Sequence, residues 1–135
     1  MKAIMEVKNL CKTYGSLIAV DDISFEVYEG EIFGMVGPNG AGKTTTIECI
    51  EGLRRPDGGQ VRLLGMDPWH KRREIAEQVG VQLQESALPS RLRVREALAM
   101  FASFYEHQAD ADELIDRLGL SDKRSAAFQK LSGGQ

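Results

Sequence analysis

Apolar and polar residues alternate along two stretches near the start of the chain. The first stretch covers residues 4–12 and the second covers residues 23–27, and turn-forming residues follow each of them. Alternation with a period of two is typical of strands that are buried on one face. We therefore expect an antiparallel, hairpin-rich β region at the beginning of the chain.

The pattern changes after this region. Residues 32–36 are nearly all apolar, as in a strand that is buried on both faces of a parallel sheet. From about residue 94 apolar residues recur at helical spacing, and Gly119 is expected to cap the last helix. The other predicted elements are strands at 61–64 and 79–83 and helices at 44–53, 71–78, 94–105 and 114–118. The chain thus changes from β-rich to α/β and then to helical.

The segment between the apolar strand and the first helix carries a phosphate-binding pattern. It fits G-x-x-x-x-G-K-[ST] with Gly37, Pro38, Asn39, Gly40, Ala41, Gly42, Lys43 and Thr44. Glycines allow backbone N–H groups to surround phosphate oxygens, and the start of a helix favours an anion. The lysine supplies a cation for the β- and γ-phosphates, and the hydroxyl after it can ligate Mg²⁺. A chance match is disfavoured because a strand precedes the pattern and a helix follows it.

Composition narrows the function classes further. The chain has 135 residues, of which 42% are hydrophobic, and 17 basic against 20 acidic residues give a net charge of -3. An acidic balance argues against a generic nucleic-acid binder. The spacing of Cys11 and Cys49 indicates no disulfide framework, and no apolar run approaches the ~18 residues of a membrane span. We expect a soluble protein of a reducing, intracellular compartment.

The last residues of the chain add a second motif. The sequence Leu131, Ser132, Gly133, Gly134, Gln135 resembles the signature motif of ATP-binding-cassette (ABC) ATPases. Tyr14 stands where that family places the aromatic residue that stacks on adenine, and Gln84 matches its Q-loop glutamine. With Lys43 between them, these residues occur in the family's order. The resemblance covers residues 4–135, and stretches 48–53 and 64–68 look most like bacterial drug- and polysaccharide-exporter ATPases.

The resemblance implies a fold and a division of the chain. It implies an α/β P-loop NTPase core of the ABC type, in which an antiparallel β region joins a parallel sheet. The core would cover residues 1–84, and residues 85–135 would begin the helical subdomain. The family's metal-binding Asp, catalytic Glu and switch His follow the signature. We therefore expect a truncated domain with an incomplete core, whose family hydrolyses ATP but which is inactive alone.

The resemblance also implies ligands and partners. ATP would contact Tyr14 and residues 37–45, including Thr45, and Mg²⁺ would be ligated by Thr44 and Gln84. The signature residues 131–135 would contact ATP held by a second ATP-binding subunit in a head-to-tail dimer. Transmembrane permease subunits would hold the protein at the inner, cytoplasmic face of the cell membrane, where ATP drives transport, with export favoured.

Three other functions remain open at this stage. The chain could be an ATP-binding module that does not hydrolyse ATP. A nucleic-acid-associated ABC ATPase is less favoured, because the distance between Lys43 and Leu131 leaves room only for a compact helical subdomain. A GTPase or small-molecule kinase would leave the signature motif unexplained. The local cluster of basic residues is interpreted as a solvated face; it consists of Arg54, Arg55, Arg62, Lys71, Arg72 and Arg73.

Overall fold

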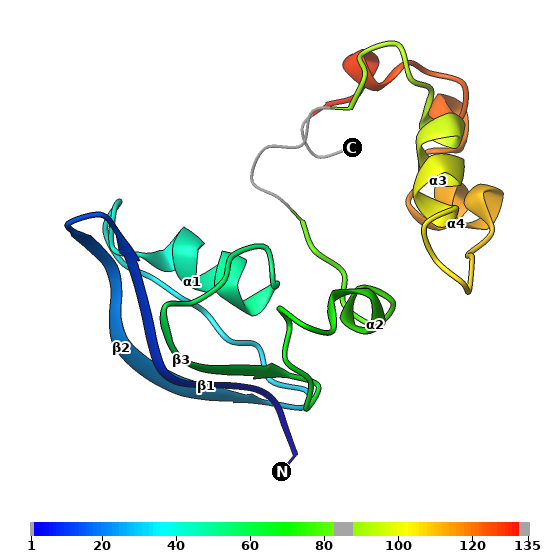
Figure 1. Cartoon of the computed structure of the whole chain (residues 1–135). Coiled ribbons are helices and arrows are strands. Elements are labelled where there is room, and N and C mark those ends of the chain that lie inside the picture. Colours follow the sequence, from blue (N-terminus) through cyan, green and yellow to red (C-terminus); the bar gives the residue numbers. More distant parts are fainter. Residues whose placement is uncertain (1, 83–87, 133–135) are drawn as a thin grey trace. The chain divides into compact units, whose positions relative to one another are not determined.

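The structure is a computed structural model that describes residues 2–82 and 88–132. The chain forms two compact units, residues 1–81 and 82–135, and each is described by itself. The first unit contains a sheet with two short helices, and the second contains helices (Figure 1).

The sheet of the first unit has three antiparallel strands. They are β1 (Ala3–Tyr14), β2 (Leu17–Tyr28) and β3 (Gly58–Leu63), in the order β2-β1-β3. Tyr14 pairs with Leu17 across a two-residue turn, in which Gly15 has a φ of 59°. Such tight turns require positive φ and match the natural twist of the paired strands. The expected antiparallel hairpin region is confirmed.

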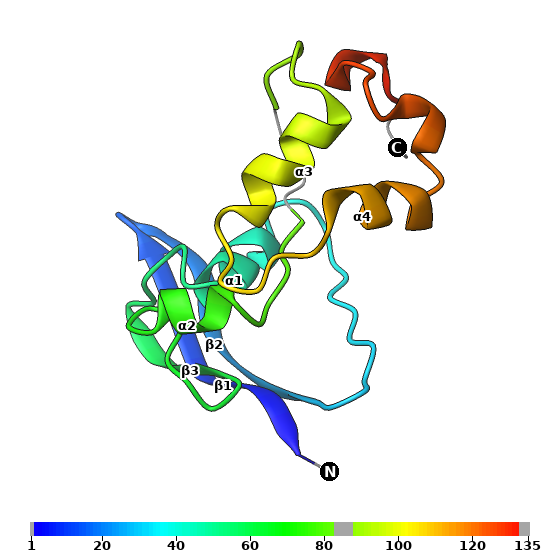
Figure 2. The same ribbon diagram turned by 90° about the vertical axis from the view of Figure 1, so that its right-hand side faces the viewer.

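Two helices pack on one face of this sheet. They are α1 (Lys43–Ile50) and α2 (Arg72–Ala76), and both lie over the same face in Figures 1 and 2. The alternation in β1 directs Val7 and Leu10 into the interior, where their side chains are almost fully buried. Burial of each such side chain stabilises the fold by about 1.5–3 kcal/mol. The buried cluster consists of Val7, Leu10, Val20, Cys49, Ile50, Val61, Leu63 and Ile75.

Two segments that were expected to be strands are not strands in the structure. Residues 32–36 have no strand assignment, and the side chains of Ile32 and Val36 are 99% and 94% exposed. Residues 79–82 also lack strand structure, and Leu83 lies outside the described residues. A buried parallel strand needs hydrogen-bonded neighbours and cover on both faces. The described residues provide only the antiparallel part of the expected core. The apolar character of these two segments therefore did not indicate that they are paired as strands.

The second unit is built around a pair of helices. They are α3 (Val94–Ala102) and α4 (Ala111–Arg117), followed by two 3₁₀ turns, Ser121–Lys123 and Phe128–Lys130. The side chain of Asp110 accepts hydrogen bonds from the first backbone N–H groups of α4, at 2.8 and 2.9 Å. Gly119, with a φ of 68°, follows the end of α4 as predicted. The core of this unit contains Val94, Ile115 and Leu120.

No described helix is long and apolar enough to cross a membrane. The described residues also contain no group of three or more acidic, histidine or cysteine side chains placed to hold a metal ion.

Candidate nucleotide-binding site

The phosphate-binding pattern forms a loop that leads into α1. Gly40 and Gly42 have φ angles of 83° and 81°, in the left-handed region that favours glycine. A Cβ atom on Gly42 would lie 2.1 Å from the carbonyl oxygen of Ala19 in β2. Gly42 therefore allows the loop to pass closely over the sheet, where a larger residue would collide with backbone.

The helix after the loop starts in a way that suits an anion. Gly42 precedes Lys43 as the N-cap, no side chain caps the first N–H groups, and the first turn contains no acidic residue. Thr46 is buried, and both its N–H and its hydroxyl donate to the carbonyl of Gly42, at 2.8 and 2.9 Å. Because these bonds fix the first turn, the free N–H groups and the positive end of the helix dipole stay in place.

The side chain of Lys43 binds back to the start of the phosphate loop. Its ammonium group donates to the carbonyl oxygens of Gly37 and Pro38, each at 2.7 Å. The cation is thus held directly beside the glycine-rich backbone. Thr44, next along the helix, is exposed, while Thr45 is half-buried.

A cavity adjoins this loop. It has a volume of about 530 Å³ and lies between β2 and the loop, with Gly40, Ala41, Lys43 and Asp21 among the residues that line it. Glycine backbone, uncapped helix N–H groups and an ammonium form a donor set that fits a polyphosphate. The exposed hydroxyl of Thr44 is a ligand type that Mg²⁺ accepts.

Tyr14 lies at the end of β1 in the same unit as the loop. The residue is 38% exposed, and its ring lies near basic groups that the motifs did not indicate. The guanidinium carbon of Arg54 is 5.2 Å from the ring centroid, and Lys12 Nζ is 5.6 Å from it. Arg54 also forms an ion pair with Glu48 at 2.6 Å. The interpretation of Arg54 as part of a solvated face is therefore incomplete.

The remaining predicted site residues belong to the second unit or to undescribed parts. Leu131 is half-buried and packs against the core of Val94, Ile115 and Leu120, while Ser132 is exposed. Gln84, Gly133, Gly134 and Gln135 lie outside the described residues. The structure thus brings Tyr14, Lys43 and Thr44 into one unit and leaves the metal role of Gln84 and the signature contacts as predictions.

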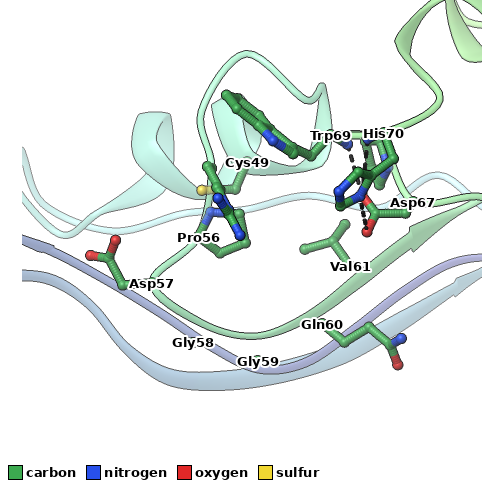
Figure 3. Close-up of a pocket in the computed structure, with 12 residues that line it drawn as sticks. Cys49, Pro56, Asp57, Gly58, Gly59, Gln60, Val61, Asp67, Trp69 and His70 are labelled. Carbon is green, nitrogen blue, oxygen red and sulfur yellow. Dashed lines mark hydrogen bonds and ion pairs between the residues drawn. The ribbon is translucent and has the colours of Figure 1, made fainter.

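A second cavity, of about 330 Å³, lies beside β3 (Figure 3). None of its lining residues belongs to the phosphate loop. Trp69 and His70 border it, and the carboxylate of Asp67 accepts from the backbone N–H of both residues and lies 2.9 Å from the His70 ring Nδ1. Burial works to raise the pKa of Asp67, but these hydrogen bonds outweigh it and hold the pKa below its ordinary value.

Comparison with known proteins assigns the family. The sequence model of the family described as "ABC transporter" matches residues 20–135, which is well over half of the chain. The chain belongs to the ABC transporter family. The family assignment agrees with the resemblance seen in the phosphate loop and the signature motif.

Two relatives illustrate this ABC transporter membership. The chain is 38% identical to the Nod factor export ATP-binding protein I of Paraburkholderia xenovorans strain LB400, with 98% of the chain and 45% of that protein covered. It is 36% identical to the probable multidrug ABC transporter ATP-binding protein YbhF of Escherichia coli K12, with 98% and 24% covered. The chain therefore spans less than half the length of these curated relatives.

Solved structures show the same fold. An ATP-binding subunit of an ABC transporter superposes with a TM-score of 0.81 at 27% identity, covering 96% of this chain and 56% of that one. A nucleotide-free ATP-binding cassette from an ABC transporter gives a TM-score of 0.79 at 25% identity, covering 99% and 61%. The chain therefore has the fold of part of an ABC-type P-loop core.

Proposed function

We propose that this chain binds ATP with Mg²⁺ as part of the energising subunit of an ABC exporter. The observation that carries the proposal is the arrangement of the loop, in which Lys43 and the uncapped start of α1 converge beside glycine backbone. The export assignment is supported by the names of the relatives, which are export and multidrug ATP-binding proteins.

Each predicted residue has a role in this proposal. Backbone N–H groups within residues 37–45, of which Pro38 has none, hold the phosphates. Lys43 neutralises the β- and γ-phosphates, and Tyr14 stacks on adenine. Thr44 and Gln84 ligate Mg²⁺, which would neutralise charge that develops on the phosphates. Residues 131–135 contact the nucleotide of a second ATP-binding subunit.

The proposal extends to the setting of the protein. Closure of the nucleotide-bound pair would shift transmembrane permease subunits between two conformations, as a change in populations. These permease subunits would keep the protein at the cytoplasmic face of the membrane. Nucleic acid is not expected as a partner, which agrees with the acidic composition.

We also propose that the chain alone binds ATP without turning it over. The residues predicted to contact ATP include no carboxylate that could activate water as a general base. Steady-state phosphate release with ATP and Mg²⁺ tests this second proposal, and sustained turnover by the purified chain would overturn it.

Binding itself is tested by calorimetric titration of ATP in the presence of Mg²⁺. Lys43→Met removes the charge-assisted bonds to phosphate, so we expect ATP affinity to fall by more than about tenfold. Lys71→Met is the matched control, because Lys71 is exposed at the start of α2, outside the phosphate loop, and pairs with Glu74 at 2.7 Å. Equal ATP affinities for the two variants would contradict the assigned site.

A further inference from the structure

Two cations lie over the ring of Tyr14. Arg54 and Lys12 lie 5.2 and 5.6 Å from its centroid, within the ~6 Å over which a cation is attracted to an aromatic face. The residue is partly exposed at the end of a strand, so such contacts can restrict where the ring lies.

Arg54 is itself fixed to α1. Its Nε donates to the carboxylate of Glu48 at 2.6 Å, and its backbone N–H donates to the carbonyl of Glu48 at 3.0 Å. Glu48 belongs to α1, the helix that begins at Lys43. A chain of contacts therefore runs from the helix of the phosphate loop through Glu48 and Arg54 to the ring of Tyr14.

Lys12 has a different role in the same region. Its ammonium is bound to Asp57 at 2.7 Å, and the other oxygen of Asp57 accepts from the N–H and hydroxyl of Thr13 at 2.8 and 2.9 Å. Asp57 and Lys12 thus fix the backbone at the end of β1. Arg54, in contrast, joins the Tyr14 ring to α1.

We propose that Arg54 is a positioning residue for adenine recognition, whose guanidinium holds the Tyr14 ring at a set place relative to the phosphate loop. The inference rests on the proposed function, because it takes the ring of Tyr14 as the adenine platform. A nucleotide must place its phosphates at α1 and its base on Tyr14 together. A ring that is already anchored to α1 loses less conformational freedom when the base binds.

The test compares ATP with inorganic tripolyphosphate, which has phosphates but no base. Both are titrated calorimetrically, at one Mg²⁺ concentration, into the full chain and into Arg54→Gln and Arg55→Gln variants. The Arg55→Gln control makes the same charge change at an exposed neighbour. We expect Arg54→Gln to weaken ATP binding roughly three- to fivefold and to leave tripolyphosphate binding unchanged, while the control changes neither.

A double-mutant cycle separates positioning from direct contact. If Arg54 acts through the ring, Arg54→Gln adds no further loss of ATP affinity to a Tyr14→Leu chain. A loss that persists in that background, or that is equal for tripolyphosphate, would overturn the proposal. No loss of ATP affinity in Arg54→Gln would also overturn it, while leaving the proposed function standing.

A measurement without nucleotide tests the contact between Arg54 and the Tyr14 ring directly. Proton NMR of the Tyr14 ring should show larger shifts in Arg54→Gln than in Arg55→Gln, because only the first removes the guanidinium from the ring. Equal shifts would refute the contact itself. If the unmodified chain bound neither ATP nor tripolyphosphate, the proposed function would fail, and the role of Arg54 in adenine recognition would fail with it.

Discussion

Asp57 joins several groups at the end of β1. Its carboxylate receives the ammonium of Lys12 and both donors of Thr13, and its own N–H donates to the carbonyl of Cys11 at 2.9 Å. The hydrogen bond from Lys12, followed by those from Thr13, lowers the pKa of Asp57 from 3.8 to about 2. The segment that carries Tyr14 is therefore held by a carboxylate in its ionised form.

Because of this lowered pKa, the stability of the folded state depends on pH. Because the folded state depresses the pKa, the stabilisation is complete above pH 4 and is lost as the pH falls from about 4 towards 2. We expect Asp57→Asn to lower the melting temperature near neutral pH. The melting temperature of this variant should also fall less over this acid range than that of the unmodified chain. Thermal unfolding followed by circular dichroism across pH checks this. Asp21→Asn, at an exposed position of β2, is the control. An identical pH profile for Asp57→Asn and the unmodified chain would contradict it.

Single residues differ in how far the sequence could reveal them. The resemblance to the ABC family indicated Tyr14. Motif spacing was sufficient to single out Lys43, because the chemistry of phosphate binding prescribes that residue type. It could not reveal Arg54 or Asp57, since their contacts join segments about 40 residues apart in sequence, and only the folded sheet brings them together. A cluster of basic residues in a sequence does not show which member faces an aromatic ring.

At the scale of elements, sequence patterns predicted secondary structure reliably where the partners of an element are close to it in sequence. The hairpin of β1 and β2, the helix after the phosphate loop and the helix that ends before Gly119 were all predicted, and the structure confirms them. The expected strands at 32–36 and 79–83 were not confirmed over their described residues. A parallel strand is stabilised by partners that are distant in sequence, so apolarity alone does not determine it.

The loop between sheet and helix offers a matched pair of glycines for a test. Gly40 and Gly42 have nearly the same φ, but only at Gly42 would an added Cβ meet backbone, the carbonyl of Ala19 at 2.1 Å; at Gly40 it would meet nothing within 4 Å. We expect Gly42→Ala to lower the free energy of unfolding about 1–3 kcal/mol more than Gly40→Ala does. Urea denaturation of both variants measures this difference. Equal losses would show that strain in φ, and not contact with β2, is the constraint at Gly42.

At the scale of the whole chain, exposed apolar residues are the main liability. Ile32 and Val36 are almost fully exposed and lie in a stretch without strand pairing, while Phe33 stacks on Phe25 at 5.0 Å. Exposed apolar residues beside unpaired backbone favour association with other chains.

We therefore expect the purified chain to self-associate as its concentration rises. Ile32→Ser combined with Val36→Ser should reduce the average mass measured by light scattering after size-exclusion chromatography. Leu17→Ser is the control, since Leu17 is 63% exposed but lies in a paired strand. A monomeric unmodified chain at all concentrations would refute the expectation.

The two bonds of Lys43 to the loop carbonyls have a consequence for how a polyphosphate would enter. The ammonium has three N–H donors, and its bonds to Gly37 and Pro38 use two of them, so a phosphate oxygen can accept the third while both carbonyls keep theirs. Ligand uptake then adds a bond to a cation that the loop already orients. The measured affinity accordingly depends on where the loop carbonyls hold the cation, so a change in the loop can raise or lower affinity without touching the ligand.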